Sequence, residues 1–311
     1  KKAPFGEVLK VLGMPMEHNA EMEAIALEKG FDALFPSAVA DEAKKIAERG
    51  ITADDIKNRR DIRDVTTFTI DPEDAKDFDD ALSFKKLPNG NFEIGIHIAD
   101  VSHYVALSTH LDEEARHRGT SVYLVDRTIP MLPEELSNGL CSLNERVDRL
   151  TFSSMFEMDK EGKVHNEWFG RTVMHSNKRF TYENAQKVLD DKQGEFYDEL
   201  FTLNSIAKKL FKKRFEEGAI SLEQEEVKFK LDDKGVPLSV YTKVRGDTNK
   251  MIEEFMLLAN RRVAEFMSPK KAGDSGVFLY RIHDLPNKEK MGDLATFLKK
   301  LGYNMKLKDG I

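Results

Sequence analysis

The sequence predicts an α/β fold of the mixed α+β type, because strand and helix patterns alternate along it. Residues 92–99 alternate between apolar and polar or small side chains, the period of two that is typical of a half-buried strand. Residues 195–217 instead repeat apolar side chains at three and four positions, as an amphipathic helix does. Residues 251–267 continue the helical pattern with more apolar side chains, which predicts a buried helix. Sheets with packed helices are therefore expected.

The composition is that of a soluble globular protein with a highly charged surface, since 40% of the 311 residues are hydrophobic and 33% are charged. No apolar run approaches the ~18 residues that a membrane span needs. The single cysteine, Cys141, rules out an internal disulfide and suits a reducing compartment. These features predict a cytoplasmic protein without a membrane segment. The chain opens on Lys1 without an initiator Met, which suggests a piece of something longer.

The N-terminal part predicts one strand and two helices. Residues 4–12 have the apolar composition of a strand. Residues 19–30 and 37–49 have helical periodicity, and Gly30 and Gly50 end the two helices. These helices are expected to form a connector to the main domain.

The middle of the chain predicts hairpins and short helices in turn. Pro88-Asn89-Gly90-Asn91 is a strong hairpin signal. Between Ile129 and Leu143, an apolar stretch with two prolines and little periodicity predicts an irregular loop with a functional role. The remaining expected elements are a helix at 109–118, a strand at 121–125, a hairpin from 150–158 and 164–173, and a helix from 182 to 189.

The chain is organised around the acidic loop, Asp71–Asp80, in which six of ten residues are acidic and only Lys76 opposes them. The strand-like residues 66–70 precede it and the apolar residues 81–84 follow it, so both ends are tied to the core. Two like charges about 4 Å apart repel by roughly 4 kcal/mol at an effective dielectric of about 20. The loop must therefore protonate, splay into water or hold a cation.

The residue types favour magnesium or manganese, because those ions take oxygen ligands and no Cys or His lies in the loop. The candidate ligands are Asp71, Asp77, Asp79 and Asp80. A solvated acidic loop is the alternative. An EF-hand is excluded because the loop lacks its sixth-position Gly and twelfth-position Glu. An aspartate-nucleophile phosphatase is disfavoured because such enzymes carry their Asp-x-Asp directly after an apolar strand, whereas Asp77 follows Asp74-Ala75-Lys76. His97 and His103 have no third partner nearby and are interpreted as structural.

Residues 69–81 closely resemble the catalytic signature of the ribonuclease II/ribonuclease R (RNB) family, whose members are hydrolytic, processive 3′-to-5′ exoribonucleases. The resemblance extends from about residue 4 to the end and is strongest to the bacterial ribonuclease R branch. Further family motifs follow in order, at residues 98–102, 119–123, 130–133, 136–143, 252–260 and 281–283.

The resemblance implies three regions and an activity. Residues 1–18 would be the C-terminal strand of an OB-type cold-shock domain, residues 19–58 the helical connector, and residues 59–311 an RNB catalytic domain truncated at its C-terminus. The implied activity is processive degradation of single-stranded RNA to nucleoside 5′-monophosphates with Mg²⁺, or Mn²⁺, as cofactor. The expected partner is single-stranded RNA, not DNA or a membrane, and a monomer is expected.

The resemblance also implies roles for single residues. Asp71, Asp77 and Asp80 would hold the metal, and Asp79 is the residue whose loss most specifically stops cleavage. Tyr123 matches the tyrosine that stacks on the last nucleotide; packing in the core is the alternative. Leu222 stands where the family often has a stacking Phe, so one π-face is lost.

Two features leave the activity of the chain itself open. The family's arginine, in a Ser-Pro-Ile-Arg-type segment, has no counterpart before Ile311. A non-catalytic RNA-binding module with a structural, metal-bound acidic loop is therefore the alternative function. The net charge of −7 is neutral evidence on RNA, because bound divalent ions would offset it and basic residues gather at 208–214 and 270–271.

Overall fold

The computed structural model describes residues 6–220, 226–232, 237–242, 244–268, 278–282 and 284–305. The chain divides into two compact units, Lys1–Asn260 and Arg261–Ile311. The first unit contains a large sheet and most of the helices. The second contains the end of α8 (Asp247–Met267) and α9 (Lys288–Lys300).

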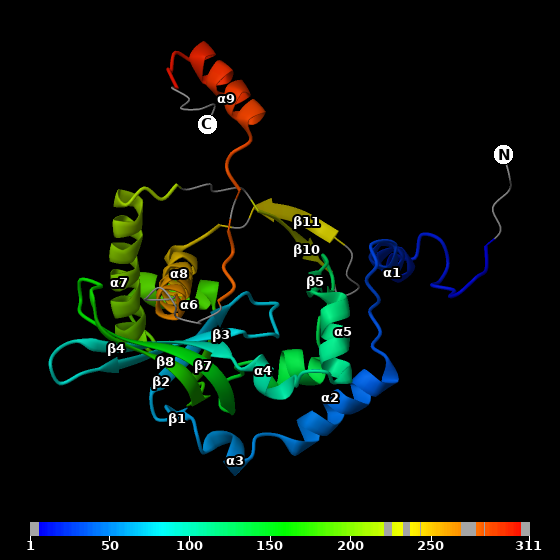
Figure 1. Ribbon diagram of the computed structural model, residues 1–311, viewed down its shortest axis with the longest axis horizontal. Helices are drawn as coiled ribbons and strands as arrows, with labels where there is room; N and C mark the ends of the chain where they lie inside the picture. Colours follow the sequence, from blue (N-terminus) through cyan, green and yellow to red (C-terminus); the bar gives the residue numbers. More distant parts are fainter. Residues whose placement is uncertain are drawn as a thin grey trace. The chain divides into compact units, whose positions relative to one another are not determined.

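Within the described residues, the main sheet has seven strands (Figure 1). The outer pairs β1–β8 and β2–β9 are parallel, and all other neighbours are antiparallel. The two smaller sheets are β5 (Val122–Tyr123) with β6 (Thr128–Ile129), and β10 (Val227–Leu231) with β11 (Pro237–Thr242). Across the main sheet the order is β1 (Arg60–Asp61), β8 (Val164–His175), β7 (Asp148–Met158), β4 (Phe92–Ala99), β3 (Asp80–Lys86), β2 (Thr66–Asp71) and β9 (Lys178–Thr181).

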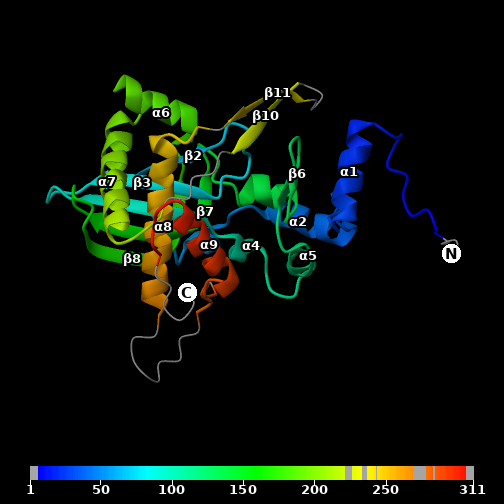
Figure 2. The ribbon, with the colours of Figure 1, turned by 90° about the horizontal axis from the view of Figure 1, so that it is seen from above.

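One face of the sheet packs against α6 (Tyr182–Asp191), α7 (Tyr197–Glu216) and α8, which lie on the same side of it (Figures 1 and 2). The fully buried side chains of Phe68, Phe156 and Phe255 come from two strands and α8 and meet in this core. Burying large aromatic side chains on both layers stabilises this arrangement.

A second core forms between the sheet and a group of short helices. Buried members include Ala43, Leu111 and Leu136, which come from three different helical elements. The helices that contribute are α2 (Ser37–Arg49), α4 (Val101–Tyr104), α5 (His110–Arg118) and the π-helix η1 (Glu135–Leu140); α1 (His18–Glu28) and α3 (Ala53–Ile56) complete the helices of the first unit within the described residues.

Most predicted elements are confirmed, with small shifts at their ends. α2 begins at Ser37 and ends at Arg49, as periodicity predicts. α5 ends at Gly119, whose φ of 70° is the left-handed conformation that favours glycine. The predicted hairpin of 150–158 and 164–173 is formed by β7 and β8, with the turn at residues 159–163.

The predicted strand at residues 4–12 is wrong for the part that the structure describes. Residues 6–12 belong to no strand, and Val8 and Leu9 are 79% and 92% exposed. The physical reason is the absence of a partner in the described part of the chain, because an isolated strand leaves its backbone groups without a ladder.

The stretch from Ile129 to Leu143 is not the irregular loop that was expected. It contains the π-helix η1, which buries Leu136 completely. π-Helical turns are rare and frequently lie at functional sites. Among the described residues, no helix is both long and apolar enough to cross a membrane.

Candidate active site in the acidic loop

The acidic loop joins the adjacent strands β2 and β3. Asp71 is the last residue of β2 and Asp80 the first of β3, so two of the four predicted carboxylates stand at strand ends. Residues 72–79 form no regular element between them. The β2 and β3 strands pair with each other, which brings Asp71 and Asp80 to the same edge of the sheet. All four aspartates thus lie at or between the ends of two paired strands.

Burial within a group of like charges disfavours ionisation at this edge. Burial first, and then the carboxylates of Asp80 and Asp79, raise the pKa of Asp71 to about 7. Burial and the Asp79 carboxylate raise the pKa of Asp80 to about 6. The pKa of Asp79 is also raised, by partial desolvation of its carboxyl group and then by Asp77, although the residue as a whole is exposed. The electrostatic conflict expected from the sequence therefore exists in the folded chain.

The donor set fits a hard divalent cation. All four side chains are carboxylates, and Asp71 Oδ2 is buried without a hydrogen-bond partner among the described residues. In the same part of the chain, however, no three Asp, Glu, His or Cys side chains converge closely enough to hold an ion. An ion would therefore require the carboxylates to turn toward one another.

Tyr123 lies next to the acidic loop and not in the core. Its hydroxyl donates a hydrogen bond to Asp77 Oδ2 at 2.6 Å. That bond, and then burial, raise the pKa of Tyr123 to about 12. The side chain is 65% exposed, so the alternative in which it packs in the core is wrong. Leu222 and His283, by contrast, lie outside the described residues.

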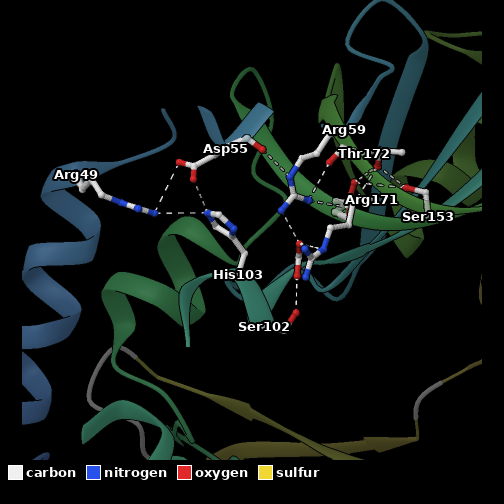
Figure 3. Close-up of polar contacts among 10 residues, drawn as sticks. Arg49, Asp55, Arg59, Ser102, His103, Ser153, Arg171 and Thr172 are labelled. Carbon is white, nitrogen blue, oxygen red and sulfur yellow. Dashed lines mark hydrogen bonds and ion pairs between the residues drawn. The ribbon is translucent and has the colours of Figure 1, made fainter. Parts of the chain in front are cut away.

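The end of the loop is attached to the β4 strand. The N–H of Ala99 donates to the carbonyl oxygen of Asp79 at 3.0 Å. The next residue, Asp100, forms a fully buried ion pair with Arg59, with 2.7 Å between Nη2 and Oδ2. Ser102 donates to the other oxygen of Asp100 at 2.7 Å. Figure 3 shows Arg59 and Ser102 pointing toward the same carboxylate.

Two histidines make structural contacts near this region. His97 Nδ1 lies 2.6 Å from Ser153 Oγ on the neighbouring strand β7. His103 Nε2 lies 3.1 Å from Asp55 Oδ1, and Arg49 approaches the same carboxylate, as Figure 3 shows.

Sequence reasoning missed three residues that the fold brings to the loop, Ser142, Arg179 and Tyr182. Burial, and then the nearby carboxylates of Asp80 and Asp71, raise the pKa of Tyr182 to about 12. Parallel pairing of β9 with β2 places Thr181 opposite Asp71 and so brings Tyr182 to the site. For Ser142, the available signals were the irregular stretch and the family motif at residues 136–143. No local sequence pattern pointed to Arg179 or Tyr182.

Comparisons with known proteins agree with this geometry. The RNB domain family model matches residues 59–311. Ribonuclease R of Thermotoga maritima is 42% identical over 98% of this chain and 43% of its own length. Inactive exonuclease DIS3L2 of Arabidopsis thaliana is 36% identical over 97% of this chain and 30% of its own length.

A solved structure agrees with the sequence relatives. Mycoplasma genitalium RNase R, in complex with ribose methylated single-stranded RNA, superposes with a TM-score of 0.85 at 28% identity. The match covers 96% of this chain and 47% of that one, so the chain spans less than half of each of these three proteins. The signature aspartates, the fold around them and the family match lead to one conclusion: the chain belongs to the RNB domain family.

Proposed function

We propose that this protein is a metal-dependent, hydrolytic 3′-to-5′ exoribonuclease that degrades single-stranded RNA processively to nucleoside 5′-monophosphates. The observation that carries the proposal is the group of four aspartates in the acidic loop, two of them at the ends of the paired strands β2 and β3, with the pKa values of Asp71, Asp79 and Asp80 raised. Carboxylates that suppress one another's ionisation gain most from a bound cation.

The aspartates would divide the work between binding and chemistry. Asp71, Asp77 and Asp80 would hold Mg²⁺, or Mn²⁺ in its place. Bound divalent ions supply positive charge for the phosphodiester and lower the pKa of water. Asp79, the exposed last residue of the loop before β3, would orient or deprotonate the attacking water.

The RNA contact would come from an exposed ring beside the aspartates. Tyr123, which is exposed and hydrogen-bonded to Asp77, would stack a base close to the carboxylates, and such stacking contributes about 1–3 kcal/mol per base. Leu222 would cover the opposite face without a π-system. We further propose that the protein acts as a monomer in the cytoplasm, which a buried, unpaired Cys141 suits.

A non-catalytic RNA-binding role is the second candidate, since one relative at 36% identity is named an inactive exonuclease. In that case the acidic loop would bind metal for folding alone. Retention of all four signature aspartates beside an exposed Tyr123 favours the enzyme.

The test is the degradation of a 3′-tailed single-stranded RNA by the full-length protein, with and without magnesium. Shortening from the 3′ end to mononucleotides and a short limit product is expected only with the metal. The matched control is Asp80→Asn, which should lose magnesium binding in calorimetry together with the activity. Binding of RNA and metal without any shortening would favour the non-catalytic candidate. Shortening without metal would overturn the metal requirement.

A further inference from the structure

Two side chains from distant segments hold the backbone of the acidic loop. Ser142 follows the π-helix η1, and Arg179 lies on the edge strand β9. We propose that Ser142 and Arg179 are positioning residues that fix the conformation of the acidic loop and thereby the spacing of its carboxylates. The inference deepens the proposed function and rests on it for its catalytic consequence.

Ser142 brackets Asp77 with a single hydroxyl. Its Oγ donates to the carbonyl oxygen of Lys76 at 2.8 Å and accepts from the N–H of Phe78 at 3.0 Å. The two bonded groups flank Asp77 on either side, so they define the direction in which its side chain leaves the loop. Ser142 is completely buried, and water cannot take over these two bonds if the hydroxyl is removed.

The π-helix and the next strand fix Ser142 itself. Its N–H donates to the carbonyl oxygen of Gly139 at 3.2 Å. Its carbonyl oxygen accepts from Arg149 Nε at 2.7 Å. The following residue, Leu143, donates its N–H to the carbonyl oxygen of Phe78 at 2.8 Å. The segment after the π-helix therefore runs along the loop and meets it through three backbone groups.

Arg179 holds the start of the loop. Its Nη2 donates to the carbonyl oxygens of Pro72 at 2.6 Å and Glu73 at 3.0 Å. Its guanidinium carbon lies 5.4 Å from the centre of the Phe78 ring, in cation–π contact. Pairing of β9 with β2 sets Arg179 opposite Thr69, and so near the end of β2 where the loop begins.

Ser142 and Arg179 both hold the loop by its backbone. Every hydrogen bond that they make to the loop uses a backbone group, so no aspartate side chain is occupied. Six acidic residues in ten repel one another, and a loop without these bonds would splay into water. Ser142 and Arg179, the clamp, therefore fix the backbone of the loop while leaving the aspartate side chains free to turn toward a cation.

The test compares Ser142→Ala, Arg179→Met and Arg179→Lys with the wild type in the full-length protein. Hydrogen exchange of residues 72–80, without metal, measures the loop directly. Exchange should be faster in Ser142→Ala and Arg179→Met, and manganese affinity in calorimetry should fall by about tenfold, the scale for lost outer-shell partners. Arg179→Lys keeps the charge and one donor nitrogen. Its loop exchange and its manganese affinity should therefore lie between those of Arg179→Met and the wild type.

Two variants provide matched controls elsewhere in the fold. Ser153→Ala removes another buried serine hydroxyl, which contacts His97 Nδ1 and Thr172 Oγ1. Arg118→Met removes another arginine that donates to backbone carbonyls, those of Asp32, Leu34 and Pro130, and lies over an aromatic ring; it also pairs with Glu114. Both should lower thermal stability without changing exchange in the acidic loop.

Loop exchange decides the inference independently of any nuclease assay. Wild-type exchange in both Ser142→Ala and Arg179→Met would overturn it, as would equal acceleration in the two controls. A wild type that degraded no RNA would instead defeat the proposed function and leave the clamp in place. With an active wild type, Ser142→Ala should regain its rate as magnesium is raised, whereas Asp79→Asn should not.

Discussion

At the scale of single residues, Asp79 and Asp80 are chain neighbours with different surroundings. Asp80 begins β3 and is half-buried, whereas Asp79 is exposed in the loop. Only the backbone of Asp79 is tied down, through Ala99. This difference agrees with separate roles, a ligand at Asp80 and a residue that acts on water at Asp79.

Asp79→Asn should separate chemistry from binding. The change removes a charge while preserving size, so RNA affinity measured in calcium should stay the same or rise slightly. The single-turnover rate in magnesium should fall by at least about 10²-fold, the scale for a lost acid–base group. A parallel collapse of affinity and rate would instead make Asp79 a binding or folding residue.

Tyr123 allows its ring and its hydroxyl to be tested apart. Tyr123→Ala should lengthen the limit product, because the ring that would stack on the terminal nucleotide is gone. Tyr123→Phe keeps the ring and loses only the bond to Asp77, so the product length should not change. Since the side chain is 65% exposed, both variants should keep the wild-type melting temperature within a few degrees. A product ladder that both variants leave unaltered would contradict stacking.

At the scale of elements, the strands β4, β7 and β8 are joined by side chains as well as by their backbones. Register places His97 opposite Ser153, and Thr151 opposite Thr172. The hydroxyls of Ser153 and Thr172 lie 2.5 Å apart and continue the row begun by His97. Gly95 is required beside this row, because a Cβ there would lie 2.5 Å from the His97 ring.

His97 should make stability depend on pH. Complete burial lowers the pKa of His97 to about 3, against an ordinary value of 6.5. Between those values the unfolded chain binds one more proton than the folded chain, so acid lowers the free energy of unfolding. The slope from this residue is about 1.4 kcal/mol per pH unit. Between pH 7 and pH 5, the free energy of unfolding measured with urea should fall correspondingly less in His97→Asn than in the wild type. Equal losses would show that His97 titrates normally.

At the scale of the whole molecule, the chain has a net charge of −7, whereas the RNA that it is proposed to bind is a polyanion. The repulsion between the two is greatest at the acidic loop. The folded-state pKa values of Asp71 and Asp80, about 7 and 6, exceed the ordinary value of 3.8. Without metal, these groups should therefore stabilise the fold at low pH and lose that contribution as pH rises toward 7.

Magnesium should reverse that loss, because in the proposed function it would bind the ionised carboxylates of the folded chain. We expect the rise in melting temperature caused by magnesium to be larger at pH 7.5 than at pH 5.5. Asp80→Asn, measured at both pH values, should reduce the rise at pH 7.5 most. The same rise at both values in the wild type would argue that magnesium binds elsewhere.

The sequence by itself determined most of the regular elements and the charge of the acidic loop. Periodicity located α2, α5 and the β7–β8 hairpin, since each is specified by local residue patterns. Repulsion within residues 71–80 predicted a place for a cation. The local pattern predicted a strand at residues 4–12, but the described residues 6–12 form none. A strand needs partner strands, and no pattern within the strand itself supplies them.

Only the tertiary structure decided what surrounds the aspartates. Ser142 and Arg179 reach the loop from 66 and 107 positions away, measured from Lys76 and Pro72. Strand order and register bring them there, and neither can be read from a local pattern. The tertiary structure likewise decided that Tyr123 is exposed. A strand pattern alone is equally compatible with a tyrosine that packs in the core. Local sequence encodes which groups are charged and which segments are regular, whereas their mutual distances depend on contacts between segments far apart in the chain.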